Sequence, residues 1–220
     1  MNARCHRSRT ARGFTLVELL VSVGLTALLM WGILQLYTSA TRFSATMFTE
    51  AELVSGGRAV LDRLCHELGS AATLDVGYFK ILNDASTSLD RIQFVAPVGA
   101  DGEMVHVAYF VDSDGMLYRL ALPPDNAGAP ALSGPPIDPD TYKSSTYCSS
   151  LGVRVQQMDV KYISYSSPTG TPSDASLSLT SASADPHLPR AVLVELKLAD
   201  NRGTISMVIS CGAQLGGSGT

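Results

Sequence analysis

The chain has 220 residues, 45% hydrophobic and 16% charged, so it can bury a core and is not a generally disordered protein. Its net charge of −4 is uneven, because the first 13 residues contain four arginines and no acid, which leaves 12 basic against 20 acidic residues elsewhere. An acidic body without a basic, aromatic-rich patch argues against nucleic acid as a partner.

A long apolar segment follows the arginines and reads FTLVELLVSVGLTALLMWGIL over residues 14–34, with Glu18 as its single charge. At about 1.5 Å per residue, a helix of this length spans roughly the 30 Å of a bilayer core. Because the arginines precede it, the positive-inside rule predicts a cytoplasmic N-terminus and an outward-facing remainder. Trp31 and Tyr37, at its outer end, are expected to be interface anchors.

A general secretory signal peptide is the alternative interpretation of this segment, and Thr38-Ser39-Ala40 loosely resembles a cleavage site of small residues. Two features argue against it. The apolar run exceeds the usual h-region of about 7–15 residues. Glu18 also lies inside the run, where a carboxylate costs about 2.5–3.5 kcal/mol and is a functional candidate by default.

The residues Gly13-Phe14-Thr15-Leu16-Val17-Glu18 resemble the processing site of type IV pilins and type II secretion pseudopilins. The resemblance implies that prepilin peptidase cleaves between Gly13 and Phe14 and methylates the new N-terminal amine of Phe14. It also implies that Glu18 pairs with the N-terminal amine of a neighbouring subunit during assembly. One departure is Gln35, where major pilins often have a helix-bending proline, so we expect a straighter helix.

Helical periodicity continues beyond the membrane segment, with charged residues, including Glu67, over much of the remaining circumference. The apolar positions are Leu53, Val60, Leu61, Leu64, Leu68 and Ala72. We expect Gly56-Gly57 to loosen or bend this amphipathic helix. The predicted organisation is a leader at 1–13, a transmembrane or filament-core helix at 14–36, an amphipathic extension at 37–73, a periplasmic β domain at 74–215 and a flexible tail at 216–220.

Alternating apolar residues predict β-strands in the rest of the chain. The predicted strands are Arg91–Ala96, Met104–Val111, Met116–Leu122, Val153–Tyr165, Ala191–Leu198 and Thr204–Ser210. Turns are expected at 112–115 and 201–203, and two long loops at 123–150 and 166–190. The predicted fold class is therefore α+β, with a long N-terminal helix packed on an antiparallel β-sheet, which is also the pilin architecture.

Four cysteines occur, and Cys5 would leave with the leader. Cys65 falls on the apolar face of the predicted helix, so we interpret it as a small core residue. Cys148 and Cys211 are the favoured disulfide pair in an oxidising compartment, although sequence alone does not fix the connectivity.

Asp112 and Asp114 form a weak calcium candidate, because closely spaced carboxylates suit this cation. A plain hairpin turn is the favoured interpretation, since the other ligands of a calcium loop are missing. The sequence contains no zinc-protease motif, nucleophile elbow or phosphate-binding loop. We therefore predict a non-catalytic protein without a cofactor.

The resemblance implies a low-abundance minor pilin of the PilW or PilJ type that primes or caps pilus assembly. Its implied partners are prepilin peptidase, other pilins or pseudopilins, an inner-membrane assembly platform and membrane lipid. The predicted location is the inner membrane, with the C-terminal domain in the periplasm, and then the filament. Two alternatives stay open: a pseudopilin of a type II secretion system, and a membrane-anchored ligand-binding or adhesion module.

Overall fold

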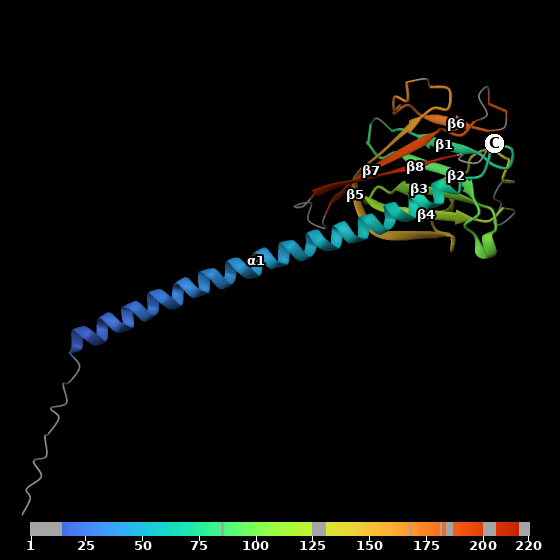
Figure 1. Ribbon diagram of the computed structural model, residues 1–220. Helices are drawn as coiled ribbons and strands as arrows, with labels where there is room; N and C mark the ends of the chain where they lie inside the picture. The colour runs from blue at the N-terminus through green and yellow to red at the C-terminus, as the bar shows by residue number, and fades with distance from the viewer. Residues whose placement is uncertain are drawn as a thin grey trace, which may run out of the picture. The chain divides into compact units, whose positions relative to one another are not determined.

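The computed structural model describes residues 15–84, 86–124, 131–167, 169–180, 182–183, 187–199 and 206–215. In this part of the chain the helices and strands are α1 (Leu16–Gly69), β1 (Phe79–Leu82), β2 (Arg91–Ala96), η1 (Ala100–Gly102), β3 (Val105–Val111), β4 (Met116–Leu122), η2 (Pro139–Tyr142), β5 (Cys148–Ile163), β6 (Leu177–Leu179), β7 (Ala191–Ala199) and β8 (Ser206–Gln214) (Figure 1). Gly13 and Phe14, the predicted turn at 201–203 and the tail at 216–220 lie outside the described residues.

The chain divides into two compact units, Met1–Phe48 and Thr49–Thr220. In the first unit the structure describes one apolar stretch of α1. The second unit contains the last turns of α1 and all the strands. Because α1 has no break from Leu16 to Gly69, the helix continues through Gln35 and through the glycine pair that the sequence predicted would loosen it.

The strands form one eight-stranded sheet in the order β6-β1-β2-β3-β4-β5-β7-β8, with antiparallel neighbours throughout. The sheet has two parts, one on the β4 side and one on the β7 side, and the 16-residue strand β5 belongs to both. Residues up to Arg154 pair with β4, and residues from Val155 onward pair with β7. The predicted fold class, a long N-terminal helix with an antiparallel sheet, is confirmed.

The predicted strands correspond closely to β2, β3, β4 and β7, and more loosely to β5 and β8. Two short strands were missed. β1 is only four residues long, and β6 has three residues inside the predicted loop at 166–190. Helix α1 ends at Gly69, before the predicted boundary at residue 73, and Ala72 N–H then donates to the carbonyl of Val95 at 2.7 Å.

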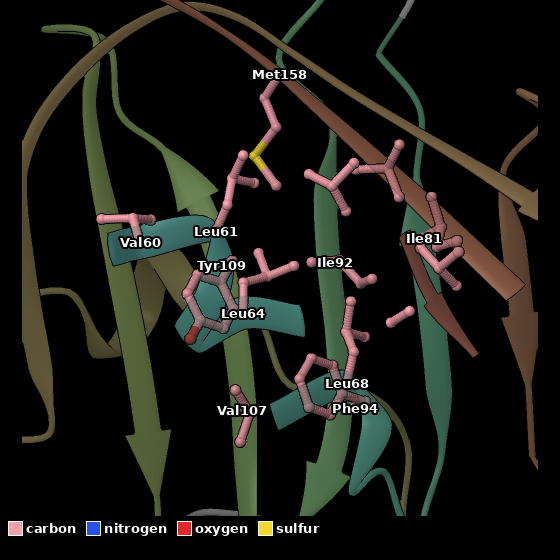
Figure 2. Packing of buried hydrophobic residues seen from close by; sticks show 14 of the residues in the cluster. Val60, Leu61, Leu64, Leu68, Ile81, Ile92, Phe94, Val107, Tyr109 and Met158 are labelled. Atoms are coloured by element: carbon pink, nitrogen blue, oxygen red, sulfur yellow. The ribbon is translucent and has the colours of Figure 1, made fainter. Parts of the chain in front are cut away.

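One face of the sheet packs against the last turns of α1. Residues of the helix three and four positions apart lie on one side, so they can contact the sheet together. In Figure 2, Val60, Leu61, Leu64 and Leu68 approach β-strand residues such as Tyr109. Leu64 and Leu68 are completely buried, and at about 25 cal/mol per Å² of buried apolar surface this packing stabilises the helix against the sheet.

The opposite face of β3 and β4 is covered by residues 131–147. Phe110 of β3 and Leu120 of β4 form a second apolar cluster there with Ile137, and Tyr142 and Tyr147 pack against it. Arg91 fixes the covering segment by a salt bridge to Asp140, at 2.6 Å. The described part of the predicted loop at 123–150 is therefore a packed cover, which explains why every residue of β3 is buried.

Candidate assembly site

The start of α1 places Glu18 within the first helical turn. Thr15 precedes the helix, and its hydroxyl accepts a hydrogen bond from the Glu18 amide at 3.3 Å. A threonine followed by glutamate three residues later is the capping pattern that begins helices. The carboxylate is therefore held near the N-terminal end of α1, close in sequence to Phe14, where the resemblance locates the methylated amine.

The part of α1 that belongs to the first unit, up to Phe48, has apolar side chains on all sides of the helix. All described residues from Thr15 to Phe48 are exposed, and Leu16 and Leu36 reach 77% and 74% of full exposure. A helix that is apolar all round is normally buried in a membrane or among other helices. Among the described residues, α1 is the one helix long and apolar enough to cross a membrane by length and composition.

The polar groups of this stretch are mostly satisfied within the helix itself. Ser22 donates to the Leu19 carbonyl at 2.9 Å, and Thr26 donates to the Ser22 carbonyl at 2.7 Å. Such bonds let hydroxyls enter an apolar environment at low cost. Glu18 is the only charged residue from Leu16 to Leu34, so its carboxylate is the group that most needs an external partner.

The last turns of α1 are fixed to the sheet by a buried charge network around Glu67. Its carboxylate accepts hydrogen bonds from Arg119 at 3.0 Å, from Tyr109 at 2.8 Å and from Arg63 at 3.0 Å. Tyr109 of β3 and Arg119 of β4 are directly opposed in the ladder, so both side chains reach the same face. The prediction that Glu67 lies on the polar side of the helix was wrong: it is 4% exposed.

The protonation of this network follows from its geometry. Burial alone would raise the pKa of the Glu67 carboxyl, but hydrogen bonds from Arg119, Arg63 and Tyr109 outweigh that effect and hold the pKa below its usual value. Burial, and then the adjacent Glu67, raise the pKa of Tyr109, so its hydroxyl stays a donor. Glu67 therefore remains ionised, and the network joins the helix to two strands.

Gly57 lets α1 approach β7 and β8 closely. A Cβ atom at this position would lie 2.3 Å from Cδ1 of Leu198 and 2.4 Å from Cδ1 of Ile209. The neighbouring Gly56 has more room, since its Cβ would be 3.6 Å from Cγ2 of Val153. Gly56 is thus dispensable for packing, whereas Gly57 is required by the helix–sheet contact.

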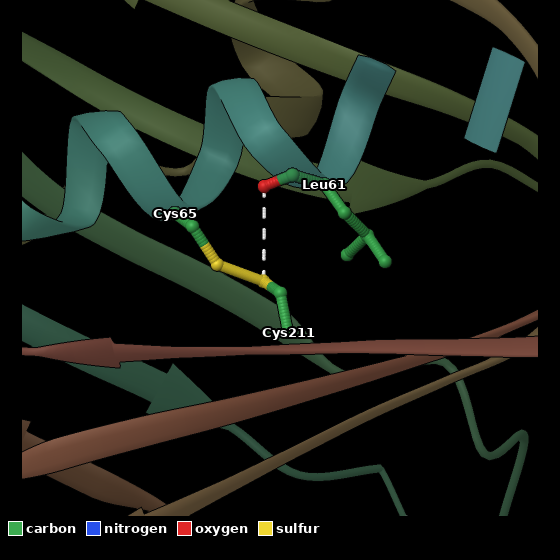
Figure 3. Close-up of a disulfide and its surroundings, with 3 residues drawn as sticks. All are labelled: Leu61, Cys65 and Cys211. Carbon is green, nitrogen blue, oxygen red and sulfur yellow. Dashed lines mark hydrogen bonds between the residues drawn. A yellow bond between two sulfur atoms is a disulfide. The ribbon is translucent and has the colours of Figure 1, made fainter. Parts of the chain in front are cut away.

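A disulfide links Cys65 of α1 to Cys211 of β8, with a Cα–Cα distance of 6.7 Å and a sequence separation of 146 (Figure 3). The Cys211 sulfur also lies 3.7 Å from the Leu61 carbonyl oxygen. The predicted pairing of Cys148 with Cys211 was wrong. Cys65 packs against the core, as its position on the apolar face of the helix predicted, but its disulfide was missed.

The physical reason is the pleat of the sheet. Successive residues of a strand point to opposite faces. Cys211 packs with the cluster on the α1 side, whereas Cys148 packs with Phe110 and Ile137 on the covered face. Cys148 is a free, partly buried thiol, and burial raises its pKa.

The segment from Asp112 to Gly115 is the hairpin turn between β3 and β4, as predicted. The Gly115 amide donates to the Asp112 carbonyl at 2.8 Å, and Gly115 has a φ of +75°, which favours glycine. The Asp112 carboxylate is paired with the Lys143 ammonium, which lowers the pKa of Asp112. Within the described ranges, no group of three or more acidic, histidine or cysteine side chains could hold a metal ion.

A profile of the prokaryotic N-terminal methylation motif matches residues 8–34. This segment contains Gly13, Phe14 and Glu18 and continues into the apolar stretch of α1. The motif supports a protein of the type IV pilin-like or pseudopilin class and implies processing by prepilin peptidase and assembly with other pilins. No curated protein and no solved structure matches the chain.

Proposed function

We propose that this chain is a minor type IV pilin, a non-catalytic subunit that primes or caps pilus assembly. The observation that supports this most is the methylation motif at residues 8–34, which includes the start of an apolar stretch of α1 that is exposed on all sides. Such a helix is stored in lipid before assembly and is buried among the helices of other subunits afterwards.

Glu18 supplies the pairing step in this proposal. Prepilin peptidase cleaves after Gly13, and the methylated ammonium of Phe14 in one subunit then meets the Glu18 carboxylate of its neighbour. Each charge is unfavourable in an apolar environment, and the pair satisfies both. The β domain faces outward and contacts sister subunits.

Two independent features support the proposed orientation. The four arginines of the first 13 residues keep the leader on the cytoplasmic side. The Cys65–Cys211 disulfide belongs to an oxidising compartment such as the periplasm. Both features support a location of the β domain in the periplasm and then on the filament surface.

The test is deletion of the gene, followed by counting of surface pili and by quantification of the chain in sheared filaments after complementation. The proposal expects few or no pili without the chain, and substoichiometric amounts of it in restored pili. Normal piliation with a defect in protein export would instead identify a pseudopilin. Normal piliation and export, with the chain confined to membranes, would identify an anchored binding module.

A further inference from the structure

The two edges of the sheet differ in length and regularity. β6, at one edge, has three residues, whereas β8, at the other, has nine. β8 pairs with β7 continuously from Ala191↔Gln214 to Ala199↔Ser206, without a shift of register. In the described ranges no strand lies on the outer side of β8, so no described residue pairs with this edge, which is called the open edge below.

The ladder indicates which backbone groups of β8 point outward. The Leu215 N–H donates a hydrogen bond to the Arg190 carbonyl at 3.1 Å, so the backbone N–H and C=O of Leu215 point toward β7. The direction of these backbone groups alternates along an antiparallel strand. The backbone N–H and C=O groups of Ile209 and Cys211 therefore also point toward β7, whereas those of Val208 and Ser210 point away from it. The same alternation gives an outward-facing amide at Gly212.

This edge lacks the usual features that prevent strand addition. Natural edges are commonly protected by charged side chains, proline, bulges or short length. The β8 sequence SMVISCGAQ contains no charge and no proline, and Val208 is 64% exposed. Lys197 and Glu195 lie on β7 opposite Val208 and Ser210, one strand inward.

The open edge is also rigidly supported from behind. Ile209 lies within the close contact at Gly57, and Cys211 is covalently joined to Cys65. A strand added to β8 would therefore be connected to α1 through this packing contact and this disulfide.

We propose that β8 accepts an extended, uncharged segment of a sister subunit as an additional antiparallel or parallel strand. Main-chain hydrogen bonds to Val208, Ser210 and Gly212 give affinity, and side chains give specificity. The added segment has an apolar residue beside Val208 and a small residue beside Gly212. It carries no charged side chain, because a charge would lose its hydration against the uncharged β8 strand. Only the source of the segment, a sister subunit, rests on the proposed function.

The test uses a photo-cross-linking amino acid at Val208 of the full-length chain, produced with the complete set of filament subunits. Sheared filaments are irradiated, and the cross-linked peptide is identified by mass spectrometry. The expected product joins residue 208 to an uncharged, extended segment of a sister subunit. Ser210→Pro, which removes one outward amide, should lower the cross-linked fraction about tenfold, corresponding to about 1.4 kcal/mol. Ser210→Ala, which keeps that amide, should leave it unchanged.

Proline at an outward-facing edge position is compatible with a strand, and retained Cys65–Cys211 oxidation verifies that the variant folds. Should Ser210→Pro not fold, Gly212→Lys adds a charge to the edge where a Cβ meets only the Val192 carbonyl oxygen at 4.0 Å, and the same loss is expected. Three outcomes would overturn this inference and leave the proposed function standing. The first is filaments that contain the chain but give no cross-link, and the second is an unchanged cross-link in the folded variant. The third is a product that links two β8 strands. Absence of the chain from filaments would overturn both.

Discussion

Helix α1 has the same backbone structure on both sides of Phe48 but a different chemical surface on each side. Before that residue all described side chains are exposed and mostly apolar. After it, apolar residues such as Leu64 and Leu68 occupy one face and are completely buried by the sheet. Secondary structure alone therefore does not distinguish the two regions, whereas the distribution of apolar side chains around the helix does.

The difference shows which partners each region needs. The second region finds its partners within the chain, through packing, the Glu67 network and the disulfide to Cys211. The first region has an apolar surface and a carboxylate, Glu18, for which residues 15–48, the described part of its own unit, supply no counterpart. Substitutions in the first region should therefore affect assembly, and substitutions in the second should affect stability.

The largest effect is expected for Glu18→Ala. We predict that incorporation into filaments falls more than about tenfold, because an unpaired ammonium in an apolar interface costs about 3–5 kcal/mol. Membrane insertion and cleavage should persist. Immunoblots of sheared filaments and of membranes measure the two quantities. Glu52→Ala, an exposed acid in the second region, is the control and should incorporate normally. Normal incorporation of the Glu18 variant would refute the pairing role.

Arg119→Met should destabilise the β domain by about 3–5 kcal/mol, because it leaves the buried Glu67 without its main cationic partner. Chemical denaturation of the detergent-solubilised chain measures this loss. Arg63→Met, which removes the exposed partner of the same carboxylate, should cost less than about 1 kcal/mol. Equal effects of the two substitutions would contradict the assignment of Arg119 as the main partner.

The same network predicts a pH dependence. The pKa of Glu67 is lower in the folded chain than its usual value, so its stabilising contribution is present above the unfolded pKa of about 4.5 and is lost as the pH falls through the folded pKa. Glu67→Gln should flatten this acid-side loss of stability. An unchanged slope in that variant would assign the loss to other carboxylates.

Cys65→Ser should cost about 2–4 kcal/mol, because the native bond closes a long loop and restrains the unfolded chain. Thermal unfolding under oxidising conditions is the measurement. Cys148→Ser is the matched control, since that thiol is free, and we expect a change below about 1 kcal/mol. A larger effect at Cys148 than at Cys65 would show that the connectivity is wrong.

The glycine pair should give effects of opposite sign. Gly57→Ala is predicted to destabilise the chain by about 1–3 kcal/mol through overpacking against Leu198 and Ile209. Gly56→Ala should stabilise it by up to about 1 kcal/mol, because alanine favours the helix and has room beside Val153. Urea midpoints of the two variants provide the test, and two changes of the same sign would contradict the close contact.

Local patterns in the sequence were sufficient to predict the helix and most strands. Periodicity identified Val60, Leu64 and Leu68 as core residues, and alternation identified β3 and β7, because each of these signals is contained in a short stretch. β1 and β6 are too short to show alternation.

The contacts that fix α1 to the sheet were not predictable in the same way. Glu67 meets Arg119 across 52 residues, and Cys65 meets Cys211 across 146. Their partners depend on which face of the sheet each strand residue occupies, which follows only from the complete strand order. The one available signal was Arg119 inside the apolar run MLYRLAL, because a buried arginine needs an acidic partner. The methylation motif, by contrast, is local and was recognisable from residues 13–18.

The central claim is that the first region of α1 is a processed, methylated element of a filament. The most direct test is the N-terminal mass of the chain, isolated from membranes that contain prepilin peptidase. We expect a chain that begins at methylated Phe14. A chain that begins after Ala40, or one that retains Met1, would contradict it, and the protein would then be a secreted or simply anchored β domain.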